Sequence, residues 1–351
     1  ELSILFFYVY GLAGVKGTEG SGKGDRAPLF RVQEPGEAAR HYGLPLPRLE
    51  AALSEARARL LAARALRPRP FRDDKVMADW NGLAIGALAF ASRSLPEPRY
   101  LEAARGAADF VLEHLDDKRG GLRHYFRDGA SPVPGLLDDY AFLSAGLLEL
   151  YEASGQTRYL GEARRLAGVM LERFSDVSAG GLRFAETGME ASLPPLRDFY
   201  DGALPSGNSV AALALIRLGR FCGEERWTRA GEGILEAGSR GLAERPEAYA
   251  CLLMAWDFAQ GPVTEVVVAG PASDPEVKRM RRVSDGRFAP CQVTLWRDPA
   301  AGGGAALERL APWVAALSPG DAKPAAYLCR DQACRFPVNS AEELEKLLQF
   351  L

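Results

Sequence analysis

The chain has 351 residues, of which 47% are hydrophobic and 25% charged, and its formal net charge is −3. These values are typical of a globular protein with two domains, or with one large domain and an appendage. The slightly acidic balance gives no sign of the basic surface that nucleic-acid-binding proteins usually carry. The longest apolar run, Leu2 to Val15, is too short to span a bilayer and lacks the features of a signal peptide. We therefore expect neither nucleic acid nor membrane as a partner.

The five cysteines are too few and too scattered for the disulfide framework of a secreted protein, so we predict a cytoplasmic location. Two thiolates, Cys329 and Cys334, cannot complete the four-ligand set of a structural zinc, and their spacing is not that of a Cys-x-x-Cys redox site. We favour packing thiols here over a reversible disulfide, and we predict no metal or other cofactor. The chain begins with Glu1 rather than Met, which favours a start inside a longer protein.

Residues 13–37 are rich in glycine and lack periodicity, so we predict a loop. The segment Gly17 to Lys23 matches the first seven positions of a phosphate-binding loop. The next position, Gly24, should be Ser or Thr to reach magnesium, and Pro28 would break the helix that must follow. A glycine loop is therefore favoured over a nucleotide site.

A repeat of about 60 residues is the most informative pattern in the chain. After one helix that starts at Leu46 and stops before Pro68, two units carry the same marks in the same order. Arg-Tyr-Leu begins at residues 99 and 158, and Gly-Gly-Leu begins at residues 120 and 180. A third, weaker copy starts at residue 205, and residues 247–258 are similar to the first half of a fourth.

Each unit is predicted to be a helical hairpin whose first helix is apolar nearly all round and whose second is amphipathic. This asymmetry favours two concentric layers, with inner helices enclosed by outer ones. An α-solenoid is less suitable, because its repeats usually span about 34–47 residues. The fold class predicted is mainly α, a toroid of (α/α) hairpins.

The composition changes after residue 261. Short apolar strands at residues 265–269, 291–296 and 325–329 alternate with helices at 275–283, 307–317 and 341–350, which predicts a small parallel or mixed α/β layer. The predicted domains are a glycine-rich remnant of a truncated N-terminal region (1–40), a toroid part (41–261) and a small α/β domain (262–351).

Four segments resemble signatures of one family, the thioredoxin domain-containing, spermatogenesis-associated protein 20-like proteins. They are residues 73–83, 137–143 and 201–210 and the tail 327–338, in the family's order. The resemblance implies a thioredoxin-like domain, absent from this chain, followed by a toroid of the six-hairpin glycosidase type and a C-terminal α/β piece. About four hairpins are recognisable here, so the toroid is expected to be incomplete. Asp79 departs from the pattern, since a small or hydroxyl residue is usual there.

Three polar clusters occur at the starts of the predicted inner helices, which should converge on one mouth of a central cavity. Helix N-termini favour carboxylates and hydroxyl-rich ligands, and aromatic rings offer flat faces to a sugar. We predict Asp139 and Asp201 as general acid and base of glycoside hydrolysis. The alternative for each residue is an ordinary helix cap. The predicted substrate-binding residues are Asp74, Asp79, Trp80, Asn81, Asp138, Tyr140, Tyr200, Ser206 and Asn208.

The leading functional hypothesis is a carbohydrate-processing-like toroid with glycoside hydrolase-type chemistry. The first alternative is a non-catalytic scaffold or binding module for a thioredoxin-like domain. The second is a sugar epimerase whose histidines lie in the missing part, because His41, His114 and His124 all fall outside the inner-helix starts. The open side of an incomplete toroid would expose apolar helices. We therefore expect association with the missing N-terminal half or with a second copy.

Overall fold

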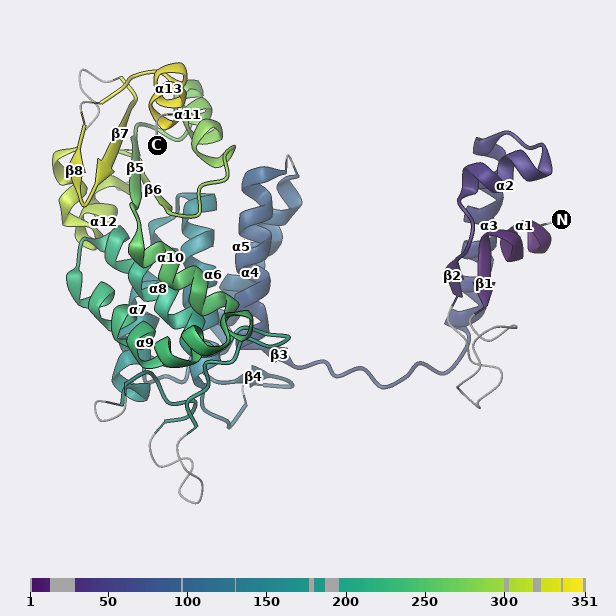
Figure 1. Cartoon of the computed structure of the whole chain (residues 1–351), viewed down its shortest axis with the longest axis horizontal. Coiled ribbons are helices and arrows are strands. Elements are labelled where there is room, and N and C mark those ends of the chain that lie inside the picture. The colour runs from purple at the N-terminus through teal and green to yellow at the C-terminus, as the bar shows by residue number, and fades with distance from the viewer. Residues whose placement is uncertain are drawn as a thin grey trace. The chain divides into compact units, whose positions relative to one another are not determined.

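The structure, a computed structural model, describes residues 2–12, 29–95, 97–129, 131–176, 180–186, 196–299, 303–317, 323–335 and 337–349. It divides into two compact units, Glu1–Asp73 and Asp74–Leu351, each of which is described by itself (Figure 1). Among the described residues, no helix has the length and apolar character needed to cross a membrane. The Gly17 to Lys23 segment lies outside the described residues.

The first unit packs three helices around a small apolar core. Its elements are α1 (Leu2–Val9), β1 (Tyr10–Leu12), β2 (Leu29–Arg31), α2 (Pro35–Tyr42) and α3 (Leu46–Ala65), with β1 and β2 antiparallel. Leu49 and Leu53 of α3 are buried with Phe6 and Val9 of α1. The predicted helix at Leu46 is thus confirmed, and it packs within this unit against α1 and α2.

The second unit contains the predicted helical hairpins. The helices are α4 (Ala78–Ser94), α5 (Pro98–His114), α6 (Leu137–Ser154), α7 (Thr157–Phe174), α8 (Gly207–Cys222), α9 (Glu225–Glu244) and α10 (Ala250–Gln260). The inner helices α4, α6, α8 and α10 form a row in which each contacts the next, while α5, α7 and α9 each pack on the inner helix before them (Figure 1). The fold is mainly α, a hairpin toroid part with a small α/β domain.

Burial distinguishes the middle of this row from its ends. Most residues of α6 and α8 are buried, as expected for enclosed inner helices. In contrast, α4 exposes Trp80 and Phe90, and α10 exposes Leu253, Met254 and Trp256. The two end helices of the row therefore carry exposed apolar side chains that the two middle helices lack.

Glycines allow α4 and α6 to touch backbone to backbone. A Cβ atom on Gly82 would lie 2.5 Å from the main chain of Phe142 and Leu143, and one on Gly146 would lie 2.3 Å from the carbonyl oxygen of Gly82. Real Cβ atoms do not approach so closely, and a side chain here would need the helices to separate. This contact sets the starts of α4 and α6 side by side.

The α/β domain is a four-stranded mixed sheet in the order β6-β5-β7-β8. Its strands are β5 (Thr264–Ala269), β6 (Gln292–Arg297), β7 (Ala325–Arg330) and β8 (Ala333–Cys334); β5 and β6 are parallel and the other pairs antiparallel. Val267 and Leu295 belong to the helical core, whereas Val266 and Val268 pack with α11 (Pro275–Asp285) and α13 (Ala341–Gln349). The described part also includes α12 (Gly303–Leu310) and the 3₁₀ segment η3 (Pro312–Ala316).

The preference for packing thiols at Cys329 and Cys334 was wrong. The two cysteines lie directly opposite each other on β7 and β8 and form a disulfide. A spacing of five residues across a tight hairpin brings the two side chains to the same face of the sheet. Cys222, Cys251 and Cys291 are free.

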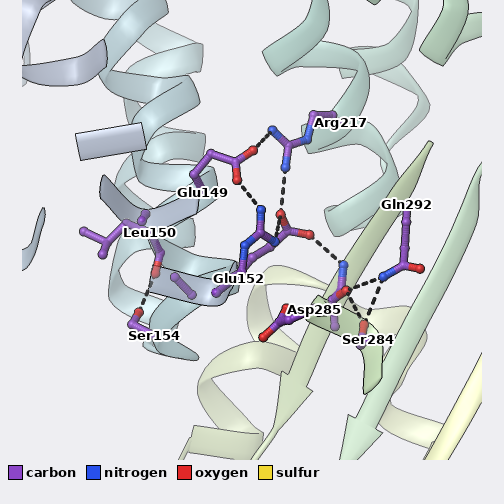
Figure 2. Close-up of polar contacts among 12 residues, drawn as sticks. Glu149, Leu150, Glu152, Ser154, Arg217, Ser284, Asp285 and Gln292 are labelled. Carbon is purple, nitrogen blue, oxygen red and sulfur yellow. Dashed lines mark hydrogen bonds and ion pairs between the residues drawn. The ribbon is translucent and has the colours of Figure 1, made fainter. Parts of the chain in front are cut away.

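A network of charged side chains joins the C-terminal ends of the inner helices to the sheet (Figure 2). Glu152 of α6 pairs with Arg93 of α4 at 3.0 Å and with Arg217 of α8 at 2.8 Å. Its Oε1 accepts the N–H of Thr294 on β6 at 2.8 Å. Glu149 pairs with the same two arginines. Each of these charged groups thus has an oppositely charged partner. Since Glu152 also binds the backbone of β6, this end of the helix row forms an interface between the hairpins and the sheet.

Candidate functional site

The opposite end of the row, where the inner helices start, holds the predicted polar clusters. Asp139 is completely buried there. Its Oδ1 accepts the N–H of Asp79 at 3.0 Å, and its Oδ2 accepts the N–H of Leu136 at 2.7 Å. One carboxylate thus caps α6 and fastens the start of α4 to it, because both N–H groups would otherwise lack a partner.

Asp201 likewise accepts backbone hydrogen bonds from two neighbouring segments further along the row. Its Oδ1 accepts the N–H of Ser206 at 2.8 Å, and its Oδ2 accepts the N–H groups of Cys251 at 2.8 Å and Leu252 at 3.1 Å. It therefore ties the approach to α8 to the first turn of α10. The acid–base role of Asp139 and Asp201 stays a prediction, and these hydrogen bonds favour a positioning role for both.

Tyr140 and Asn208 make equivalent hydrogen bonds in successive repeats, each to the leucine of a Gly-Gly-Leu loop. The Leu122 N–H of one Gly-Gly-Leu loop donates to the hydroxyl of Tyr140 at 2.8 Å, and the Leu182 N–H of the next donates to Oδ1 of Asn208 at 2.7 Å. Both side chains are fully buried. Tyr140 therefore offers no ring face to a ligand, contrary to the sequence-based hypothesis, since its ring lies in the core against Phe174.

Two further predicted residues make local hydrogen bonds at helix starts. Ser206 is the N-cap of α8, where its hydroxyl accepts the N–H of Ser209 at 3.0 Å. Asn81 donates from its amide to the carbonyl of Met77 at 2.7 Å. The capping alternative is confirmed for Ser206.

His124, which was not among the predicted site residues, also lies at the start of these helices. The strand β3 (Val76–Met77) before α4 pairs with β4 (Tyr125–Phe126), and the Ala78 N–H donates to the His124 carbonyl at 3.0 Å. The imidazole Nδ1 then lies 2.9 Å from Oδ2 of Asp139. That hydrogen bond raises the pKa of His124, and the nearby charges of Asp79 and Asp138 add to the effect. His124 lies on a loop outside the inner helices, as expected, but its side chain reaches the start of α6 through this hydrogen bond.

Asp138 is a partly buried carboxyl group with a strongly raised pKa. Its pKa is raised to about 7, first by burial and then by the neighbouring charges of Asp79, Asp139 and Asp198, while a hydrogen bond from the Gly207 N–H opposes the rise. A Cβ on Gly207 would lie 2.2 Å from Oδ1 of Asp138, so a larger residue at that position would displace the carboxyl. Asp138 of α6 therefore sits against the first turn of α8, in a site that holds a proton near neutral pH.

Asp79, whose N–H donates to Asp139, is almost completely buried. Burial raises its pKa, while the N–H of Trp80, 2.7 Å from Oδ1, and the charge of His124 oppose the rise. We define the acid–base cluster as Asp79, His124, Asp138 and Asp139. It joins three predicted residues with one that was missed, and the pKa of each of the four groups is raised in the fold.

The remaining predicted residues lie at the surface. Trp80 is 59% exposed and Tyr200 is 58% exposed, so both rings remain available to a ligand. Asp74 is exposed and pairs with Arg127 at 2.9 Å. Within the described ranges, no group of three or more His, Cys, Asp or Glu residues is arranged to hold a metal ion.

Comparison with known proteins gives strong similarity to one set of relatives. The chain is 32% identical to human spermatogenesis-associated protein 20 over 320 residues, which is 88% of this chain and 40% of that protein. It is 30% identical over 329 residues to the uncharacterized protein B0495.5 of Caenorhabditis elegans, covering 89% of this chain and 43% of that protein. The chain thus spans less than half the length of these relatives. No protein-family model matches it.

Solved structures with a similar arrangement are glycoside hydrolases and sugar epimerases. The GH76 α-mannanase BT2949 of Bacteroides thetaiotaomicron matches with a TM-score of 0.44 at 16% identity, covering 70% of this chain and 72% of that chain. Cellobiose 2-epimerase of Bacillus thermoamylovorans matches with a TM-score of 0.40 at 16% identity, covering 48% and 45%.

Proposed function

We propose that this chain, which belongs to the spermatogenesis-associated protein 20-like family, carries a carbohydrate-processing site with acid–base chemistry at the start of its inner helices. The observation that carries the proposal is Asp138, a half-buried carboxyl beside two other acids and a histidine. A capping role alone does not require a carboxyl that keeps its proton near neutral pH.

In this proposal Asp138 is the general acid that protonates the oxygen of the departing sugar. A general acid works best when its pKa lies near the working pH, because a large fraction of the group is then protonated and the proton is still readily transferred. The value of about 7 meets that condition. Glycoside hydrolysis commonly needs one carboxyl of raised pKa together with a second carboxylate, and we propose Asp79, whose charge acts on Asp138, as the second.

His124 and Asp139 complete the arrangement in this proposal. Asp139 fixes the imidazole through Nδ1, which leaves Nε2 as the atom that can exchange a proton with a ligand. The first turns of α4, α6 and α8 supply positive dipole ends, which favour hydroxyl-rich or anionic ligands. The exposed rings of Trp80 and Tyr200 are proposed to pack on sugar faces.

The test is a thermal-shift and turnover screen of the full chain against mono- and oligosaccharides, because a ligand that binds the native state raises the melting temperature. We expect a stabilising sugar whose turnover is lost in Asp138→Asn while its thermal shift persists. The matched control is Asp128→Asn, an exposed carboxyl outside the cluster, which should change neither quantity. A folded wild type that no sugar stabilises would contradict the proposal.

Sugar epimerisation is the second candidate, and the position of His124 favours it. Reversible proton transfer at a carbon beside a carbonyl needs a base that can return the proton, and histidine is well suited to that step. The two chemistries separate by NMR in D₂O. A hydrolase releases a new reducing end, whereas an epimerase exchanges the carbon-bound proton next to the carbonyl and leaves glycosidic bonds intact.

A non-catalytic alternative also follows from the relatives' greater length. In it, the hairpins serve as a scaffold for a thioredoxin-like domain in the rest of the protein, in a cytoplasmic setting. Unaltered binding of such a domain by the Asp138→Asn variant, together with no sugar effect in wild type, would favour the scaffold.

A further inference from the structure

A carboxyl and two sulfurs form a row across the small sheet, away from the acid–base cluster. Glu265 on β5 lies directly opposite Cys329 on β7, and Cys329 lies directly opposite Cys334 on β8. Directly opposed residues of antiparallel strands point to the same face, with Cβ atoms about 4.5–5.5 Å apart. The Glu265 carboxyl is therefore a side-chain neighbour of the disulfide.

Glu265 is buried without full compensation. It has no exposed surface, and its Oε1 has no hydrogen-bond partner within the described parts of the chain. Nη1 of Arg220 lies 3.5 Å from Oε1, and the Gln332 N–H lies 3.5 Å from Oε2, so both contacts are long. A buried carboxyl that is so weakly paired resists losing its proton.

The charged groups that face Glu265 come from two elements. Arg220, near the end of α8, lowers the pKa of Glu265, and Asp331, in the β7–β8 turn, raises it. Burial has a larger effect than either charge, and the pKa of Glu265 is raised to about 7 as a result. Arg220 also pairs with Asp331, which is itself 83% exposed. The proton on Glu265 is thus exchangeable near neutral pH.

The two sulfurs differ in accessibility. Cys329 is fully buried beside Glu265, whereas Cys334 is partly exposed at the edge strand. The turn between them contains Asp331 and Gln332, both at positive φ and both exposed. An external thiolate can therefore approach Cys334 more easily than Cys329, and the sulfur that would leave is the one next to the carboxyl.

We propose that Cys329–Cys334 is a reversible thiol–disulfide exchange site in which Glu265 donates a proton to the buried sulfur on opening and takes it back on closing. The reaction partner is a thiol reductant, a small thiol or a protein dithiol.

The exchange balances as two thiol steps. A thiolate attacks Sγ of Cys334, the S–S bond breaks, and Cys329 leaves as a thiolate that takes the proton of Glu265. A second thiolate attacks the mixed disulfide and releases Cys334 as a thiolate that takes up a proton from solvent. The two reductant thiols are oxidised to one disulfide, and the two cysteines gain the two electrons.

The experiment measures opening of the disulfide in the folded full chain with dithiothreitol, followed by differential alkylation and mass spectrometry of the Cys329 and Cys334 peptides. Rates are divided by thiolate concentration, so that ionisation of the reductant does not enter. We expect the wild-type rate constant to fall as pH rises through about 7, where Glu265 loses its proton. In Glu265→Gln the rate at pH 6 should fall about tenfold, a modest contribution for a positioned acid because sulfur is a weakly basic leaving group.

A second variant tests the assignment without touching the buried carboxyl. Asp331→Asn removes the exposed negative charge that raises the pKa of Glu265, so it should move the pH midpoint of the rate to lower pH. Glu225→Gln, on an exposed surface, is the control. Identical pH profiles for wild type, Glu265→Gln and Asp331→Asn would overturn the proposal, as would a disulfide that opens only when the protein unfolds.

Discussion

The Nδ1 atom of His124 lies 2.9 Å from Oδ2 of Asp139, in a part of the protein where the carboxylate is fully buried. The same carboxylate accepts the N–H groups that start α4 and α6. Because its position is fixed by the backbone of two helices, the imidazole that it binds is also fixed. The histidine is thereby oriented by the fold rather than by its own loop.

Removing the carboxylate should therefore change the titration of His124. The hydrogen bond to Asp139 raises the pKa of His124, so Asp139→Asn should bring it down toward the ordinary imidazole value of about 6.5. NMR titration of the histidine ring protons measures this, with the signals of His41 and His114 as internal controls. Because the pKa of His124 is higher in the folded protein, the protonated histidine stabilises the fold. This stabilisation is fully present below the pKa of the unfolded state and is lost as pH rises through the pKa of the folded state. An unchanged His124 titration in a folded variant would refute the role of the pair.

Asp138 should make the stability of the second unit depend on pH. Its pKa is 3.8 ordinarily and about 7 in the fold, so the folded state binds its proton more tightly. The contribution of Asp138 to the free energy of unfolding is therefore fully present below about pH 4, and it is lost as the pH rises toward 7. Asp138→Asn removes that loss and should raise the free energy of unfolding at pH 8 by roughly 1–3 kcal/mol, allowing for solvent screening.

The measurement is urea unfolding of wild type and Asp138→Asn at pH 5 and pH 8. Asp128→Asn is the control. Because that carboxyl is exposed, the substitution should change the free energy of unfolding equally at pH 5 and pH 8. A variant that is destabilised at pH 8 would show that the charged form of Asp138 is the one that the fold favours, contrary to the prediction.

The sequence predicted the hairpins well because their pattern is local. The repeated Arg-Tyr-Leu and Gly-Gly-Leu triplets, and inner helices that are apolar nearly all round, correspond to α4 through α9 in the structure. The alternation of strands and helices after residue 261 also predicted the mixed sheet. Periodicity detects such features without knowledge of distant contacts.

The site was harder to predict, because its chemistry depends on contacts between repeats. His124 reaches the cluster through a two-residue strand pair, Val76–Met77 with Tyr125–Phe126, which is too short to leave a periodic signal. The different roles of Asp138 and Asp139 also depend on which neighbouring helix start each one faces, and adjacency in sequence cannot tell them apart. One usable signal for Asp138 was the glycine at 207, which opens α8 after a capping serine.

The glycine contact between α4 and α6 should be intolerant of substitution. Gly82→Ala and Gly146→Ala would each place a methyl group within 2.5 Å of the partner backbone, and backbone cannot move aside as a side chain can. We expect each to lower the free energy of unfolding by about 3 kcal/mol, at the upper part of the range for overpacking. Gly106→Ala on α5, where no atom lies within 4 Å of the added carbon, should instead stabilise by about 0.5–1 kcal/mol. Chemical denaturation of the three variants compares them, and equal effects at all three positions would show that the close approach is not what matters.

The charged network at the other end of the inner helices should hold the small sheet in place. Glu152→Gln keeps the shape of the side chain but removes the charge that Arg93 and Arg217 share, so that Glu149 is left as the ion-pair partner of these two largely buried arginines. Breaking such a buried pair costs about 3–5 kcal/mol, whereas Glu225→Gln, in an exposed pair with Arg229, should cost less than about 1 kcal/mol. Because Oε1 of Glu152 also accepts the N–H of Thr294, hydrogen exchange at that amide should accelerate in the first variant and not in the second. Protection of Thr294 that survives in a destabilised Glu152→Gln protein would mean that the apolar face of β5 and β6, and not the ionic network, fixes the sheet to the hairpins.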